Sequence, residues 1–284
     1  MEKELLMTPR KFCHGGDHGD IVNLYEMPLT VRYGEVGPDG LTSLSSLGNW
    51  LQEAAGLSAD TLHFGSEQLF SRGLTWILMR LVLRLFRLPR IGEHLNVLTW
   101  PSKMDHFGFR GYAIYDEGHA CLAKGGSAWA VMETASRSIV SLPDDLRKSY
   151  PDNASPCDDF SCRVLPRVKN NVLQSSFLRV RHDDLDINRH VNNTRYLAWI
   201  MEPVSREFLK QHHLHESPSL IDVSFRAECF PQDELASVFA DCGQPESLGL
   251  ADTGQFRCFS HAIRKLPGGQ DVCRAISAWK TDRA

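Results

Sequence analysis

The chain has 284 residues, of which 42% are hydrophobic and 23% are charged, so it can bury a sizeable core in one large domain or two smaller ones. Its formal net charge of −4 excludes a general attraction to nucleic acid or to an anionic membrane. The eight cysteines form no CxxC pair, the first residues lack the apolar core of a signal peptide, and no uncharged apolar run approaches the roughly 18 residues of a membrane span. We therefore expect a reduced, cytoplasmic protein.

The first half of the chain predicts one helix followed by several strands. Thr42 or Ser43 can cap the helix, whose residues at helical spacing are Leu44, Leu47, Leu51, Ala54, Ala55 and Ser58. Residues 76–86 (WILMRLVLRLF) have a period of two, as in a strand that places on one face Ile77, Met79, Leu81, Leu83 and Leu85. Further strands are expected at residues 94–100, 109–116 and 127–133.

The second half repeats this coarse pattern. A polar turn, DLDINRHVNN, precedes an apolar helix that carries Tyr196, Trp199 and Ile200, and Pro203 should end or kink this helix. Strands are then expected at residues 219–225, 234–241, 256–265 and 272–280. Between the halves, residues 143–175 begin with a stretch rich in Pro, Asp and Ser, which is typical of a connector.

The two halves also match each other at a nearly constant offset. A shift of 149 positions places Val31, Arg32, Trp50 and Glu53 over Val180, Arg181, Trp199 and Glu202. A second match places Phe109 and Arg110 over Phe256 and Arg257, and residues 127–129 over residues 277–279. Two ordered matches at nearly one offset favour a duplicated unit over chance.

The polar turn before the second helix is a candidate site. In an extended segment, side chains two positions apart point the same way, so Asp186, Asn188 and His190 would line one side. Asn192 or Asn193 can cap the helix, which places its N-terminal N–H groups beside them, as suits a developing oxyanion. Asp and Asn also crowd ordinary turns. However, the first half has at the matching positions Gly37, Asp39 and Leu41, so the turn forms without this set, and we expect its role to be chemical.

The segment DLDINRHVNNTRYLAWIMEPV resembles the signature of the acyl-acyl carrier protein thioesterases of plants and bacteria, and SFRAECFPQDEL resembles a later element of that family. The similarity extends over nearly the whole chain. It implies an α+β double hotdog fold, in which each long helix is wrapped by an antiparallel sheet and the two sheets meet side by side. We expect a flexible N-terminus at residues 1–19, an N-terminal hotdog unit with the acyl-chain slot at residues 20–142, a connector at residues 143–175 and a catalytic hotdog unit at residues 176–284.

The resemblance also implies roles for single residues. Asp186, Asn188, His190 and Glu228 fall on the family's proposed catalytic group. Asn188 and His190 could then donate to the thioester carbonyl, Asp186 could orient the histidine or the amide, and Glu228 could hold or deprotonate the attacking water. Hydrolysis by this route needs neither a metal nor a cofactor.

A competing assignment concerns Cys229, which falls on a cysteine once regarded as the family's nucleophile. It would act as a thiolate activated by His190 and oriented by Asn188. We prefer the water route, because the neighbouring Glu228 would oppose thiolate formation by like-charge repulsion. In a regular strand Glu228 and Cys229 face opposite sides, so one of them should lie outside the site unless a bulge intervenes.

Two further sets of residues are expected to bind the substrate. The acyl chain needs an apolar slot, for which the first helix offers Leu47, Trp50, Leu51 and Ala54. An acidic acyl carrier protein could be steered by Arg80, Arg84, Arg87 and Arg90. Solvated charges at a strand edge are the default interpretation of these arginines.

We thus predict an enzyme that hydrolyses acyl-[acyl carrier protein] and releases free fatty acid, which terminates chain elongation. The alternative enzymes are an acyl-CoA thioesterase and a hotdog hydratase, and the alternative among non-enzymes is an acyl-binding or sensing module. A fused pair of units suits a monomer, and a homodimer is the other possibility.

Overall fold

The structure, a computed structural model, describes residues 21–150, 153, 164–168, 171–243 and 255–282. The predicted flexible N-terminus at residues 1–19 and part of the predicted connector lie outside these residues. Within them, no helix combines the length and the apolar character that a membrane span requires.

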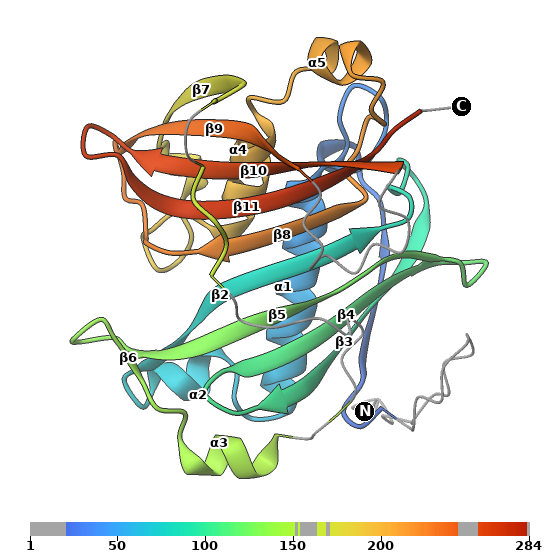
Figure 1. Cartoon of the computed structure of the whole chain (residues 1–284). Helices are drawn as coiled ribbons and strands as arrows, with labels where there is room; N and C mark the ends of the chain where they lie inside the picture. The colour runs from blue at the N-terminus through green and yellow to red at the C-terminus, as the bar shows by residue number, and fades with distance from the viewer. Residues whose placement is uncertain (1–20, 151–152, 154–163, 169–170, 244–254, 283–284) are drawn as a thin grey trace.

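One antiparallel sheet of eleven strands runs through the described part of both halves (Figure 1). The first half contributes β1 (Tyr25–Thr30), β2 (Leu74–Leu85), β3 (His94–Met104), β4 (Gly108–Asp116), β5 (Cys121–Glu133) and the short β6 (Ser138–Val140). The second half contributes β7 (Gln174–Arg179), β8 (Leu220–Phe225), β9 (Glu234–Gly243), β10 (Phe256–Lys265) and β11 (Gln270–Lys280). Every strand predicted from the sequence is present.

The strand order is β1-β3-β4-β5-β2-β8-β11-β10-β9-β7, with β6 paired to β5. Read outward from the central pair of β2 and β8, each half shows its second, fifth, fourth, third and first long strand. The two halves are therefore copies of one unit, joined through their second strands into one sheet. This arrangement confirms the predicted α+β fold of two side-by-side hotdog units.

Two long helices lie on one side of this sheet, α1 (Leu44–Thr61) and α4 (Asn193–Met201) (Figure 1). They touch at Gly48, where an added Cβ would lie 2.6 Å from Cδ1 of Leu197. The close approach of the two helices thus requires the missing side chain at this position. The helix α4 ends at Met201, shortly before Pro203, as predicted.

The shorter helical segments lie in the connections. They are η1 (Tyr33–Glu35), α2 (Ser66–Phe70), α3 (Asp144–Ser149), η2 (His182–Asp184) and α5 (Arg206–Gln211). The helix α3 lies inside the segment that we predicted as the connector, and β7 begins near the C-terminal end of that segment. Among the other connector residues, Leu165 and Val168 are buried against the second half of the sheet.

The strand β2 departs from the predicted alternation at one residue. Its pairing with β5 shifts between Leu78 and Arg80, so Met79 is a bulge. Leu81, Leu83 and Leu85 are buried in the main core as predicted, but Leu78 takes the place expected for Met79. An extra residue in a strand turns the side chains of all preceding residues to the opposite face of the sheet. A regular period of two does not predict such a change.

The pairing registers also correct one part of the internal alignment. Phe109 pairs with Ala128 in the first half, and Cys258 pairs with Ala278 in the second. The counterpart of Phe109 is therefore Cys258, and the match of Phe109 to Phe256 was wrong. Backbone pairing, not the identity of one aromatic side chain, fixes which positions correspond.

A buried ion pair joins the two halves at the central strands. Nε of Arg80 on β2 donates to Oδ1 of Asp222 on β8 at 2.7 Å, and a second guanidinium nitrogen contacts Oδ2. The two side chains are 3% and 2% exposed. The prediction that Arg80 steers a partner protein is therefore wrong, because β2 pairs with β8 at the centre of the sheet, where Asp222 and the neighbouring strand bury this side chain.

The ion pair yields a prediction about stability. Arg80→Met leaves a buried carboxylate without its partner, which should lower the free energy of unfolding by about 3 to 5 kcal/mol. The double variant Arg80→Met/Asp222→Leu removes both charges and should recover most of this loss. Denaturant unfolding followed by circular dichroism measures all three proteins. A double variant no more stable than Arg80→Met would show that charge burial is not the cause.

Candidate active site

The turn before α4 repeats the backbone hydrogen bonds of the turn before α1. In the first half, the N–H of Gly37 donates to the carbonyl of Leu41 at 2.8 Å. In the second half, the N–H of Asp186 donates to the carbonyl of His190 at 2.9 Å. Because backbone groups close both turns, the side chains at positions 186 and 190 are not needed for folding and can serve chemistry.

The backbone conformation of the turn is also the same in both copies. Gly40 has a φ of 73°, and its counterpart Arg189 has a φ of 63°. This left-handed conformation costs little for glycine but is uncommon for arginine. The second copy thus keeps a strained turn between Asn188 and His190, two residues of the predicted site.

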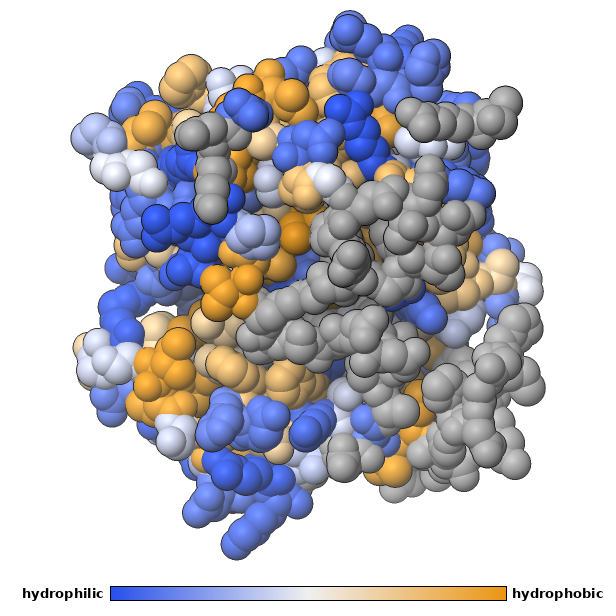
Figure 2. Space-filling model, in the orientation of Figure 1, coloured by the Kyte–Doolittle hydropathy of each residue, from blue (hydrophilic) through white to orange (hydrophobic). Residues whose placement is uncertain are grey.

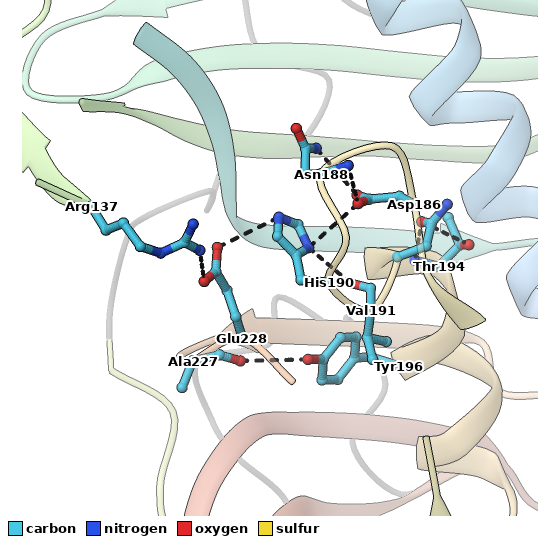
Figure 3. A network of polar contacts seen from close by, with 10 residues as sticks. Arg137, Asp186, Asn188, His190, Val191, Thr194, Tyr196, Ala227 and Glu228 are labelled. Atoms are coloured by element: carbon cyan, nitrogen blue, oxygen red, sulfur yellow. Dashed lines mark hydrogen bonds and ion pairs between the residues drawn. The ribbon is translucent and has the colours of Figure 1, made fainter. Parts of the chain in front are cut away.

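The imidazole of His190 lies between two carboxylates (Figure 3). Its Nδ1 is 3.7 Å from Oδ1 of Asp186 and 3.4 Å from the carbonyl oxygen of Val191, and its Nε2 is 3.5 Å from Oε1 of Glu228. Nδ1 has two acceptors beside it and Nε2 has one, so we assign the Nδ1-protonated tautomer to the ring. In this tautomer Nε2 and Oε1 of Glu228 are both acceptors, so a donor such as water is needed to satisfy them.

The carboxylate of Asp186 is fixed by the turn that carries it. Its Oδ1 accepts the backbone N–H of Asn188 at 2.8 Å, and its Oδ2 lies 3.4 Å from Nδ2 of Asn188. Asp186, Asn188 and His190 therefore lie together, as the sequence predicted, and all three border one cavity. Asp186 is placed to orient both of the others.

Glu228 follows β8 and reaches the same point from a different part of the chain. Its Oε2 contacts the guanidinium of Arg137, which lies in the turn after β5 in the first half (Figure 3). The carboxylate of Glu228 is 27% exposed, and the side chain of Arg137 is 48% exposed. The site thus combines residues of both halves. Arg137 was not predicted from the sequence, because a single arginine in a turn matches no pattern.

Cys229 takes part through its backbone. Its carbonyl accepts the N–H of Val191 at 2.9 Å, just as the carbonyl of Pro89 accepts the N–H of Thr42 in the first half. The side chain of Cys229 is fully buried in the main core and does not border the cavity. Burial raises the pKa of its thiol, which keeps the sulfur neutral. Of the two neighbours, Glu228 faces the site.

The N-terminus of α4 borders the cavity as well. The side chain of Asn192 caps the helix, because its Oδ1 accepts the N–H of Thr194 at 3.0 Å. Asn193 is the first helical residue, and its N–H has no acceptor within the helix by the geometry of a helix start. Both predicted oxyanion residues border the cavity, but the side chain of Asn192 is used in capping, whereas Asn193 has a backbone N–H without an acceptor in the helix.

A cavity of about 1100 Å³ extends from this cluster between α1 and the sheet. One stripe of α1 borders it, formed by Gln52, Ala55, Gly56 and Ala59. The opposite wall includes Trp76 and the following residues of β2. A largely apolar cavity that ends at a polar cluster suits an acyl chain with a reactive head group.

The predicted slot residues lie on a different face of α1. Leu47, Trp50, Leu51 and Ala54 are all less than 5% exposed in the main core, and none of them borders this cavity. The neighbouring stripe faces it instead, one residue further along the helix and so rotated by about 100°. Apolar periodicity identifies the buried stripe of a helix, whereas a cavity is bordered by small residues beside that stripe.

Two polar groups in the cavity wall were not predicted. Arg110 on β4 is 5% exposed and donates to the hydroxyls of Ser58 at 2.9 Å and Thr99 at 3.3 Å. The hydroxyl of Tyr150 donates to the carbonyl of Phe109 at 2.7 Å, and burial raises its pKa to about 12. Arg110 thus places a buried charge in an otherwise apolar wall.

The other predicted docking arginines are dispersed. Arg84 is half-buried in β2, and Arg90 is exposed after it. Arg87 is paired with Glu93 at 2.8 Å and Asp116 at 3.4 Å, which offsets its charge. In the described residues, no group of three or more His, Cys, Asp or Glu side chains is placed to hold a metal ion.

Comparison with known proteins agrees with this geometry. The family model of the acyl-ACP thioesterase N-terminal domain matches residues 22–150, and that of the C-terminal domain matches residues 169–281. The chain belongs to the acyl-ACP thioesterase family. The two matched domains correspond to the two hotdog units of the sheet.

Individual relatives are distant but match most of the chain. It is 27% identical over 277 residues to an acyl-[acyl-carrier-protein] hydrolase of Cuphea viscosissima, covering 92% of this chain and 64% of that protein. It is 28% identical over 283 residues to a dodecanoyl-[acyl-carrier-protein] hydrolase of Umbellularia californica, covering 94% of this chain and 69% of that protein. The chain thus spans less than two thirds of the first of these relatives.

Solved structures show the same fold. A 12:0-ACP thioesterase from Umbellularia californica has a TM-score of 0.76 at 25% identity, covering 94% of this chain and 100% of that one. An acyl-ACP thioesterase from Bacteroides thetaiotaomicron has a TM-score of 0.74 at 24% identity, covering 91% and 98%.

Proposed function

We propose that this protein hydrolyses the thioester of acyl-[acyl carrier protein] and releases free fatty acid, which ends chain elongation. The observation that carries the proposal is the position of His190 between Asp186 and Glu228 at one end of a long apolar cavity. Such a site can hold a water molecule beside a thioester whose acyl chain fills the cavity. The relatives named as acyl-[acyl-carrier-protein] hydrolases support the same substrate class.

In the proposed mechanism, the attacking water lies beside the pair of His190 and Glu228, at hydrogen-bond distance from both. Nε2 of His190 and Oε1 of Glu228 both accept protons and lie 3.5 Å apart, so one water can donate to both. Asp186 keeps the Nδ1 proton in place and thereby fixes this orientation of the ring. The ion pair with Arg137 holds the carboxylate of Glu228 at the water.

The thioester carbonyl is placed against donors of the turn and of α4. The backbone N–H of Asn193 and the side-chain amide of Asn188 both border the cavity and can donate to the developing oxyanion. The water oxygen then bonds to the carbonyl carbon, and its proton passes to Glu228. When the carbon–sulfur bond breaks, Glu228 gives this proton to the leaving thiolate, so acid and thiol are the only products.

This mechanism differs from the expectation for His190 and agrees with the preferred route for Cys229. We expected His190 to donate to the carbonyl, whereas in the proposed mechanism its Nδ1 proton lies against Asp186 and Val191 and its Nε2 accepts from the water. The thiol of Cys229 has no contact with His190 in the described part of the chain, and its raised pKa disfavours a thiolate. The water route therefore accounts for the site better than a covalent route.

The roles of His190 and Cys229 can be compared directly. His190→Ala should lower kcat for acyl-[acyl carrier protein] by about 10²- to 10⁴-fold, because it removes one acceptor of the water. Cys229→Ala should keep kcat within about threefold, at some cost in stability from the lost buried sulfur. Steady-state release of free thiol measures both variants, and thermal unfolding controls for their folding. An inactive but folded Cys229→Ala would instead support a covalent route.

The cavity predicts a variant with altered chain-length preference. Ala59→Met directs a longer side chain from α1 into the cavity, so the ratio of kcat/KM for the longest accepted chain to that for a shorter one should fall about tenfold. Leu57→Met is the matched control, because Leu57 lies on the same helix, is 39% exposed and does not border the cavity. Equal profiles for both variants would mean that the acyl chain binds elsewhere.

The expected cytoplasmic location and the choice between monomer and homodimer stay predictions. The same holds for the preference for acyl carrier protein over coenzyme A. A thiol-release assay with both acyl donors decides that preference, and an absence of release with either would favour an acyl-binding module.

A further inference from the structure

A second pocket, of about 480 Å³, lies where the connector residues 167 and 168 meet the joined ends of β10 and β11. Its charged lining consists of Arg167, Arg226, Arg264, Arg274 and Asp271. Figure 2 shows hydrophilic surface over this end of the second half of the sheet, at the upper left of the view. Four guanidinium groups thus surround a single carboxylate.

Two of these arginines are held rigidly. Nε of Arg274 donates to Asp271 at 2.7 Å, and Nε of Arg264 donates to the same carboxylate at 3.2 Å. The side chain of Arg274 is 5% exposed and also donates to the carbonyl of Leu165 at 3.1 Å. Because Arg264 and Arg274 share the single carboxylate of Asp271, the pocket keeps a net positive charge. The same contacts hold both guanidinium groups in place before any ligand binds.

The other two arginines have no side-chain partner among the residues that the structure describes. The guanidinium groups of Arg167 and Arg226 form neither a hydrogen bond nor an ion pair with any residue that the structure describes. Both side chains are exposed. They can therefore close on a bound anion without breaking a contact to another described residue.

Arg226 connects this pocket to the active site. It borders both the arginine pocket and the large cavity, and it precedes Glu228 by two residues. The large cavity and the arginine pocket thus have Arg226 as a common wall residue.

On this geometry, and resting on the proposed function, we infer that the arginine pocket binds the phosphodiester of the 4′-phosphopantetheine arm that carries the acyl group. This arm is a long flexible chain that carries no charge between its sulfur and its phosphate. The phosphate is therefore the negative group nearest to the thioester. Arginine matches phosphate oxygens with paired N–H donors, and fixed donors bind more tightly than mobile ones. The acyl chain would fill the large cavity, the sulfur would lie at His190, and the phosphate would lie among the arginines.

The inference is tested with three acyl donors that share one acyl chain: acyl-pantetheine, which lacks the phosphate, acyl-4′-phosphopantetheine and acyl-[acyl carrier protein]. The wild-type protein should have a KM about tenfold lower for the two phosphate-bearing donors than for acyl-pantetheine. Arg167→Glu should raise the KM for these two donors about tenfold at low salt and leave the KM for acyl-pantetheine unchanged. The matched control is Arg179→Glu, because Arg179 is an exposed arginine on β7 of the same unit, outside the pocket.

The outcomes separate this inference from the proposed function. Hydrolysis of acyl-pantetheine and acyl-4′-phosphopantetheine with equal KM would overturn the phosphate site and leave the thioesterase standing. An effect of Arg179→Glu equal to that of Arg167→Glu would show only a change in net charge, and would also overturn it. If no donor is hydrolysed, calorimetric titration with 4′-phosphopantetheine against pantetheine still decides the pocket, since only the former should bind.

Discussion

The antiparallel pairing of β2 with β8 is the constraint on which the site depends. It joins two copies of one unit into a single sheet, and the buried pair of Arg80 and Asp222 fixes the lateral position of the two strands. This position decides where the turn after β5 lies relative to the end of β8. Arg137 in the first half therefore reaches Glu228 in the second, which a separate catalytic unit could not provide.

Duplication also explains how the polar cluster could arise without disrupting the turn that carries it. Both copies close the turn before their long helix with the same backbone hydrogen bonds, and both anchor it to a carbonyl after their second strand. The side chains at positions 186 and 190 were thus free to differ from Gly37 and Leu41. The two copies differ in what they contribute, since α1 in the first half borders the large cavity and the turn before α4 carries Asp186, Asn188 and His190.

The fold and the local site were predicted well from the sequence, because both depend on patterns among residues that are close in the chain. Strand alternation, helix caps and the turn at residues 184–193 depend on neighbours in the chain. The sequence could not predict the partner of Glu228, since Arg137 is 91 residues away and belongs to no motif. It also misplaced Arg80, because its partner Asp222 on β8 is 142 residues away in the chain. On α1 it indicated the buried stripe and not the neighbouring stripe that faces the cavity.

The central claim is that an arginine from the first half positions the catalytic carboxylate of the second. It is tested most directly by a double-mutant cycle of kcat with Arg137→Met, Glu228→Gln and the double variant. If Arg137 acts only through Glu228, the double variant should be about as slow as Glu228→Gln alone. Losses that multiply in the double variant would mean that the two residues act independently, and would contradict this account.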